Sequence, residues 1–206
     1  MEAPANMLTA GGPIVPLLMG LSVLSLTLIV VKLLEFRGIL AGAERRAAAL
    51  KDWTRGDRDA AQAGLARGNA PADRVMQAVM QGLAAGMPRP ALTGEAEWRG
   101  NAEVARMSRH IRLLELVAMI SPLLGLLGTV LGMIQSFQEL AAAEGAANAS
   151  ILAGGIWQAL LTTAAGLIVA IPAAIAASML NERVERVAQQ IEIVVGQLLS
   201  TADAGN

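Results

Sequence analysis

The apolar positions of this chain fall into three long runs separated by polar segments. Residues 3–31 carry no charge, and the second part of this run, PIVPLLMGLSVLSLTLIVV, is almost wholly apolar. Further uncharged runs cover residues 116–138 and 145–181. About 20 helical residues, rising about 1.5 Å each, cross the roughly 30 Å hydrocarbon core of a bilayer. The pattern therefore predicts three transmembrane helices.

Two other interpretations of these runs are weaker. A cleaved signal peptide would need a basic start and a shorter apolar stretch, whereas this chain begins with the acidic MEAPANM. Buried helices of a soluble protein would not be expected three times in 206 residues. Composition agrees, since 54% of residues are hydrophobic and 16% are charged, against about 25% charged in soluble domains. We expect an all-α membrane protein.

The basic residues predict the direction of crossing. All but three of the 16 Lys and Arg residues lie within 37–112, and the others are Lys32, Arg183 and Arg186. Because cytoplasmic loops carry the excess of basic residues, the N-terminus is expected outside and the C-terminus inside. The expected segments are a periplasmic N-terminus (1–12), transmembrane helix 1 (13–36), a cytoplasmic helical domain (37–112), transmembrane helix 2 (113–138), a short periplasmic connection (139–154), transmembrane helix 3 (155–180) and a cytoplasmic C-terminal helix (181–206).

The cytoplasmic segment is rich in Ala, Arg, Gln and Glu, which favour helix. Gly and Pro divide it at residues 56–57 and 68–71, and most strongly at GMPRP, residues 86–90. Asp57 and Asn69 are the expected N-caps of the helices that follow the first two breaks. The segment is therefore predicted to contain several short helices.

Longer helices are expected where the polar segments meet the spans. No convincing stop lies between Thr93 and Pro122, so one helix is predicted to run from the cytoplasmic segment into the second span. Apolar residues keep helical spacing through residues 181–199, so the third span should also continue beyond the membrane. Trp53 and Trp98 are expected to pack within this helical bundle.

Small and hydroxyl residues recur at spacings of three and four in the second and third runs, which places them on one face of each helix. Such stripes most often let helices pack closely in lipid, within a chain or between subunits. Pro122 and Pro172 each remove a backbone hydrogen bond inside a span and predict kinks. The stripes comprise Ser121, Gly125, Gly128, Thr129, Gly132 and Ser136 in the second run and Ala159, Thr163, Gly166, Ala170, Ala173 and Ala177 in the third.

Two stretches in these runs resemble the paired signature of the ExbB/TolQ/MotA proton-channel family: SPLLGLLGTVLGMIQSF (121–137) and QALLTTAAGLIVAIPA (158–173). Three spans rather than four make the chain more similar to ExbB and TolQ than to MotA. The resemblance implies a pentameric ring in the bacterial inner membrane. Its second and third spans would face a pore that holds a dimer of a single-span ExbD/TolR-like partner carrying a transmembrane aspartate.

The same resemblance implies a motor driven by the proton-motive force that performs work on the cell envelope. TonB-dependent import with a TonB-like protein, a Tol-type role and a motility stator all remain open, and protons are expected rather than sodium ions. Thr129 and Thr163 match the family's pore threonines. Gln158 stands where ExbB and TolQ usually carry a glutamate, and the further candidates for the pore lining are Thr162 and Ser121.

The runs offer hydroxyls but no group that titrates. Residues 116–138 and 151–180 contain no Asp, Glu, Lys, Arg or His, although a proton relay normally uses ionisable groups. Threonine hydroxyls form hydrogen bonds without titrating near neutral pH. A partner's aspartate is therefore expected to carry the proton between Thr129 and Thr163. Glu115 is a candidate cytoplasmic exit for the ion, or it pairs with nearby arginines at the headgroups.

Other classes of function are disfavoured. The chain has no cysteine and a single histidine, His110, so we expect no metal site, no cofactor and no enzymatic activity. A net charge of −1 gives no indication of nucleic-acid binding. A self-sufficient transporter would be expected to carry its own buried charge or a pair of repeated broken helices, and neither is visible in this sequence. A structural membrane scaffold is compatible with the glycine stripes but does not require the paired hydroxyls and prolines.

Overall fold

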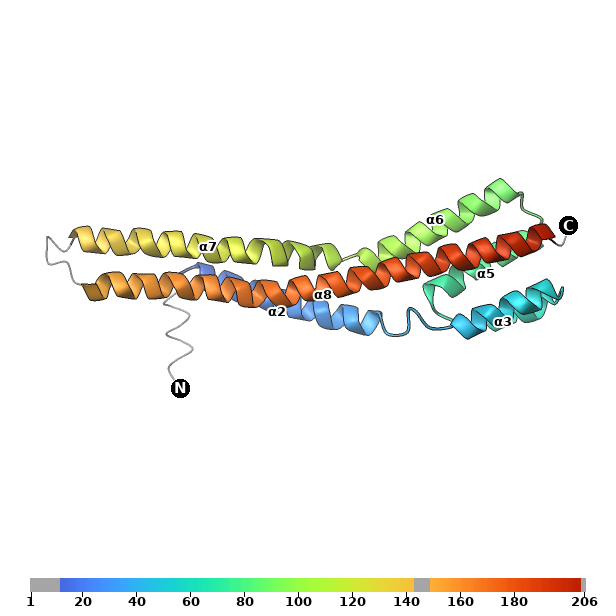
Figure 1. Ribbon diagram of the computed structural model, residues 1–206, viewed down its shortest axis with the longest axis horizontal. Helices are drawn as coiled ribbons and strands as arrows, with labels where there is room; N and C mark the ends of the chain where they lie inside the picture. The colour runs from blue at the N-terminus through green and yellow to red at the C-terminus, as the bar shows by residue number, and fades with distance from the viewer. Residues whose placement is uncertain (1–11, 143–148, 205–206) are drawn as a thin grey trace. The chain divides into compact units, whose positions relative to one another are not determined.

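The computed structural model describes residues 12–142 and 149–204, and within these ranges the secondary structure consists of helices and turns (Figure 1). The expected periplasmic N-terminus (1–12) falls almost wholly on residues 1–11, outside the described residues. Of the expected periplasmic connection (139–154), residues 139–142 and 149–154 are helical, and residues 143–148 lie outside the described residues. The helices are α2 (Ile14–Glu35), α3 (Ala43–Thr54), α4 (Arg58–Ala66), α5 (Pro71–Ala84), α6 (Arg89–Ser108), α7 (Ile111–Ala142) and α8 (Ala149–Ala204).

The chain divides into two compact units. The membrane unit comprises residues 1–33 and 110–179, and the polar unit comprises residues 34–109 and 180–206. The long helix α8 contributes residues to both. Each unit has its own buried apolar cluster, so each is described by itself.

The membrane unit contains α2, α7 and the first part of α8, and all three helices are long and apolar enough to cross a bilayer. This confirms the expectation of three candidate spans. Ile14 and Leu18 of α2 pack with Val117 of α7 and with Val169 and Ala173 of α8. The three helices therefore share one small apolar core.

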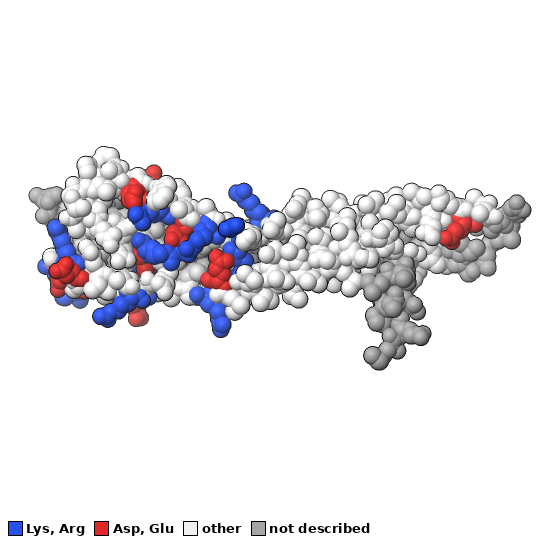
Figure 2. Space-filling model, turned by 180° about the vertical axis from the view of Figure 1, so that it is seen from behind, with Lys and Arg blue, Asp and Glu red and all other residues white. Residues whose placement is uncertain are grey.

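Most large apolar side chains of the membrane unit point away from that core. Val23, Leu126 and Ile168 are examples, with exposed fractions of 66%, 58% and 72%. Figure 2 shows one face of the molecule with the charged side chains coloured. The charges gather over the polar unit, and the membrane unit carries almost none on this face. An apolar surface of this kind is covered by lipid or by other subunits.

The polar unit buries one face of each of its helices in a shared core. Trp53 lies in this core, as expected, whereas Trp98 is 65% exposed, so its predicted burial is wrong. The buried positions of α6 are spaced four or seven residues apart, and Trp98 lies on the opposite side of the helix. The core residues are Ala49, Trp53, Ala61, Leu65, Met76, Val79, Met80, Leu92, Ala96, Leu198 and Leu199.

A buried ion pair joins helices of the polar unit that are far apart in sequence. Arg46 of α3 donates from Nη1 to Asp73 of α5 at 2.8 Å, and the two side chains are 4% and 1% exposed. The same guanidinium donates to the Ala41 carbonyl at 2.8 Å and to Gln190 of α8 at 3.4 Å. A buried charge is tolerated only when such partners satisfy it, so the network holds α3, α5 and α8 in one arrangement.

One of the two expected N-caps is confirmed. Asp57 caps α4, and its side chain accepts a hydrogen bond from the Ala60 amide at 3.1 Å. The prediction for Asn69 is wrong, because Ala70 occupies the N-cap position of α5 and Pro71 begins the helix. Proline suits this first position because its missing N–H has no intrahelical acceptor there, so no side-chain cap is required to start the helix.

The expected continuous helix into the second span is also wrong. The α6 helix starts at Arg89 rather than near Thr93 and ends at Ser108, and α7 begins at Ile111. At the break, Arg109 is extended and His110 has φ of 71°, a left-handed conformation that ends a right-handed helix. By contrast, α8 continues unbroken from the third span through residues 181–199, as predicted.

Candidate functional site: the packed faces of α7 and α8

The candidate site is built on one face of α7 that consists of small residues. The buried positions in the span are Ser121, Gly125, Gly128, Gly132 and Ser136, spaced three and four apart. Each is opposed by a residue of α8, and the partners run backwards along α8 from Gly166 to Gly155. The two helices are therefore antiparallel and in close contact, as Figure 1 also shows.

The contact is tight because several of these positions have no side chain. A Cβ atom on Gly166 would lie 2.5 Å from the Ser121 carbonyl oxygen, and one on Gly125 would lie 2.9 Å from the Thr162 carbonyl oxygen. Real Cβ contacts are essentially never shorter than 3.0 Å. The predicted role of Gly125, Gly128 and Gly166 in helix packing therefore has a specific geometric basis in this chain. At Gly132 the contact is looser, with 3.6 Å to the Ala159 side chain.

Thr162 lies at the centre of this interface. It is 1% exposed, and its hydroxyl donates to the Ala159 carbonyl of its own helix at 2.7 Å. The same hydroxyl lies 3.3 Å from the Gly125 carbonyl of α7. The spacing of Thr162 from Ala159 and Gly166 equals that of a stripe residue, which is the signal in the sequence that could have placed it there.

Thr163 and Thr129, the two predicted pore threonines, are more accessible. Thr163 is partly buried, and its hydroxyl lies 3.4 Å from the Gly125 carbonyl. Thr129 is at the margin of the buried face of α7, and its hydroxyl donates to the Leu126 carbonyl at 2.7 Å. Thr129 also lines an open, mostly apolar hollow of about 640 Å³ along α7.

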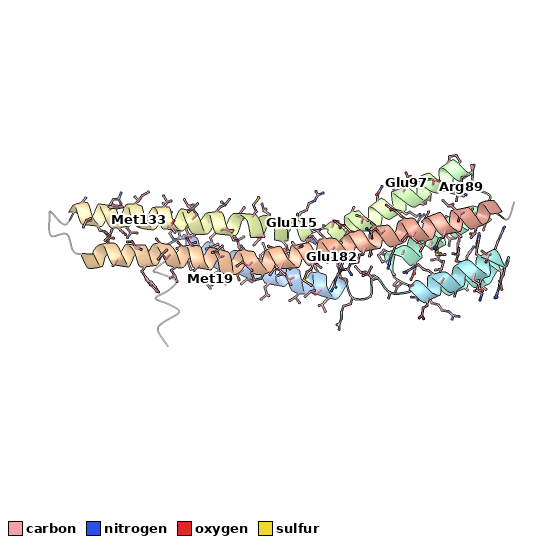
Figure 3. The ribbon with its side chains drawn as sticks, viewed as in Figure 1. Met19, Arg89, Glu97, Glu115, Met133 and Glu182 are labelled. Carbon is pink, nitrogen blue, oxygen red and sulfur yellow. The ribbon has the colours of Figure 1, made fainter. Side chains whose placement is uncertain are left out.

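The remaining candidates occupy varied positions. Gln158 is partly exposed on α8, whereas Ser121 is buried and donates to the Val117 carbonyl at 2.7 Å. Both α7 and α8 continue as helices through Pro122 and Pro172. Figure 3 shows Glu115 near the start of α7, and this side chain is exposed. The pore-lining and ion-exit roles of these residues stay predictions.

The packed faces can offer hydrogen bonds but no proton acceptor of their own. Within the described part of the chain, no group of three or more His, Cys, Asp or Glu side chains could hold a metal ion. The titratable residues nearest in sequence to the α7 motif are Glu115 and Glu139, outside the uncharged run. Hydroxyl and carbonyl oxygens could hold a water molecule or a protonated carboxyl group, provided that another molecule brings it.

Comparison with known proteins finds relatives named ExbB and TolQ. The biopolymer transport protein exbB1 of Vibrio cholerae is 48% identical over 82 residues, which are 40% of this chain and 36% of that protein. The Tol-Pal system protein TolQ of Pseudomonas aeruginosa is 36% identical over 126 residues, 61% of this chain and 47% of that protein. TolQ of Haemophilus influenzae is 39% identical over 89 residues, 43% of this chain and 39% of that protein.

The chain spans less than half the length of each of these curated relatives. The family model covers more of it, since the MotA/TolQ/ExbB proton channel family matches residues 67–193. That range includes α7, the packed part of α8, and helices α5 and α6 of the polar unit. Three candidate spans, the paired small-residue faces and this match together place the chain in the MotA/TolQ/ExbB proton channel family.

Proposed function

We propose that this protein is the ring-forming subunit of an inner-membrane motor that couples proton flow to mechanical work on the cell envelope. Its partner would be a single-span ExbD/TolR-like protein, and the ring would be a pentamer with the N-terminus periplasmic and the C-terminus cytoplasmic. The family match and the ExbB and TolQ relatives support this proposal. The placement of nearly all basic residues within 37–112 supports the direction of crossing.

One observation carries the mechanism. The spanning parts of α7 and α8 contain hydroxyl groups at their packed faces but no ionisable side chain between residues 116–138 or 151–180. A proton that crosses at this level needs a group that binds and releases it. The partner's transmembrane aspartate is the group that we propose, and this chain supplies its surroundings.

Thr129 and Thr163 would be the polar stations for that aspartate. Thr129 opens onto the hollow along α7, and Thr163 retains partial exposure beside the Gly125 carbonyl. A charged carboxylate would be stabilised beside such hydroxyls, whereas the neutral acid could pass the apolar surface between stations. Alternation between the two states under a proton gradient would bias rotation of the partner within the ring.

Proton flux into vesicles tests this proposal. The chain reconstituted alone should leave a pH gradient intact, and co-reconstitution with its ExbD/TolR-like partner should allow flux. Thr129→Val and Thr163→Val should each lower the partner-dependent flux. Substantial flux with the chain alone would show that no borrowed acid is needed, and full flux in both variants would remove the role of the threonines.

Tol-type envelope maintenance is a second candidate for the process that is driven. TolQ of Pseudomonas aeruginosa matches this chain over 126 residues, whereas exbB1 of Vibrio cholerae matches it over 82 residues. Gln158 in place of the glutamate usual in ExbB and TolQ leaves the choice between branches open. Deletion of the gene separates the outcomes: loss of TonB-dependent uptake indicates import, and leakage of periplasmic proteins indicates a Tol-type role. A scaffold would yield no partner-dependent flux.

A further inference from the structure

The polar unit contains a pocket of about 450 Å³, and five of its fourteen lining residues are arginines. It is bounded by the turn after α2, the start of α5 and the end of α6. Polar and apolar atoms contribute similar shares of its lining. The pocket is therefore neither a dry apolar cavity nor an open charged surface. The lining arginines are Arg37, Arg45, Arg67, Arg74 and Arg106.

The arginines of this pocket outnumber the acids that neutralise them. Arg74 donates to Glu103 from Nε at 2.7 Å and from Nη2 at 2.6 Å, and Arg106 lies 3.5 Å from the same carboxylate. Arg45 lies 3.6 Å from Asp73, whose carboxylate is already paired with the buried Arg46. The carboxylates of Glu103 and Asp73 are therefore each shared by two guanidinium groups. This sharing leaves net positive charge at the pocket.

Arg37 and Arg67 add charge from the rim. Both side chains are exposed, and both line the pocket without any ion pair to an acid recorded among the described residues. Glu35 is the single acidic residue in the lining. Guanidinium groups offer forks of N–H donors that match the oxygens of a phosphate group.

Two further features of the pocket fit an anionic amphiphile. The N-terminal end of the 14-residue helix α5 contributes Ala70 and Pro71, and a helix N-terminus carries partial positive charge. Ile39, which is half-buried, and Ala41, which is exposed, provide apolar surface beside the arginines. A ligand with a phosphate group and an adjoining apolar part would meet complementary groups on both sides.

The connectivity of the chain places these walls close to the membrane boundary. Arg37 is two residues beyond the end of α2, and Arg106 is five residues before the start of α7. Consecutive Cα atoms are about 3.8 Å apart, so neither residue can lie far from the end of a candidate span. Headgroup phosphates occupy this level of a bilayer.

We infer that this arginine-lined pocket binds the phosphate of an anionic phospholipid such as phosphatidylglycerol. The site goes beyond the proposed channel function, since it depends on the spans crossing a bilayer and not on proton transfer. A lipid held between the segment after α2 and the end of α6 would fix the polar unit's chain segments at the membrane surface. A soluble phosphate offers the same chemistry, so the experiment must separate the two sources.

Lipid binding to the full chain in an uncharged detergent tests this inference. Short-chain phosphatidylglycerol, short-chain phosphatidylcholine and inorganic phosphate are each titrated, and bound adducts are counted by native mass spectrometry. Phosphatidylglycerol should bind at least roughly tenfold more tightly than phosphatidylcholine. The double variant Arg37→Gln/Arg67→Gln should lower the affinity for phosphatidylglycerol by roughly tenfold.

The matched control is Lys51→Gln/Arg55→Gln, which also removes two positive charges, from exposed positions outside the pocket lining. It should change the affinity for phosphatidylglycerol by less than about twofold. Because Arg37 and Arg67 are exposed, Arg37→Gln/Arg67→Gln should unfold at the wild-type temperature. The single variant Arg37→Lys keeps the positive charge and should retain most of the binding. Equal affinity of wild type and Arg37→Gln/Arg67→Gln, or an equal loss in Lys51→Gln/Arg55→Gln, would overturn the site. Displacement of phosphatidylglycerol by equimolar inorganic phosphate would overturn the lipid source.

Discussion

Thr162 of α8 occupies the space that a side chain on Gly128 of α7 would need. A Cβ atom at Gly128 would lie 2.5 Å from Thr162 Oγ1 and 2.6 Å from Thr162 Cβ. Since the Cβ atom of Thr162 is fixed by its backbone, rotation of the side chain cannot relieve this contact. The separation of α7 and α8 at this level is therefore set by the absence of a side chain at residue 128.

Alanine substitutions along the packed face of α7 and α8 should destabilise the protein in a defined order. Gly166→Ala should cost the most, because its Cβ atom would meet the Ser121 backbone oxygen at 2.5 Å. Gly128→Ala should cost about 1–3 kcal/mol, and Gly132→Ala, with 3.6 Å to its nearest neighbour, should be close to neutral. Thermal unfolding in detergent measures the order.

Gly20→Ala in α2 is the control for these variants, because no atom other than the backbone of its own helix lies within 4 Å of its Cβ position. It should leave stability unchanged or raise it by about 0.5–1 kcal/mol, the helix propensity difference between Gly and Ala. If Gly166→Ala had the melting temperature of the wild type, α7 and α8 would not be held at the separation described.

The threonines on these helices should separate stability from function. Thr162→Val removes a buried hydroxyl that reaches the Gly125 carbonyl and should cost about 1 kcal/mol of stability. Thr129→Val removes a hydroxyl that reaches only the Leu126 carbonyl in its own helix and should change stability by less than about 0.5 kcal/mol. Its effect should instead appear as lower partner-dependent proton flux. The reverse pattern would contradict both assignments.

Loss of the Asp73 carboxylate should destabilise the polar unit strongly. Asp73→Ala leaves the buried Arg46 guanidinium without its 2.8 Å partner, and removal of one member of a buried pair costs about 3–5 kcal/mol. Denaturant unfolding of the full chain followed by circular dichroism measures the change. Glu97→Gln, on the exposed surface of α6 labelled in Figure 3, is the control and should have little effect. Equal stability of the two variants would argue against the buried pair.

The Glu103 carboxylate should contribute stability that depends on pH. Its hydrogen bond with Arg74 lowers the pKa of Glu103 below the usual 4.5, against the opposing effect of burial. A carboxyl group whose pKa is lower in the folded protein stabilises the fold above its unfolded pKa, and this contribution is lost as pH falls through the folded pKa. The melting temperature of Glu103→Gln should therefore lie below that of wild type at pH 7, and the difference should shrink below pH 4.5. A difference that is constant with pH would exclude this linkage.

Local pattern sufficed to predict the three spans, the continuation of α8 and the cap at Asp57. Each depends on residues close together in sequence: apolar length against bilayer thickness, periodic apolar positions, or a carboxylate three residues from the amide that it binds. The break at His110 has no such signal. It arises at a residue with φ of 71°, without Gly or Pro, so the expected continuous helix was wrong.

The sequence by itself determined that this protein has three helices able to span a membrane, and that its second and third spans carry small residues and hydroxyls without ionisable groups. These properties follow from composition along single helices. Only the tertiary structure decided that Thr162 is buried while Thr129 stays accessible, and that Arg46, Asp73 and Gln190 meet across separations of 27 and 144 residues. The physical reason is that contacts between helices depend on their rotation and depth relative to one another, which no single helix specifies.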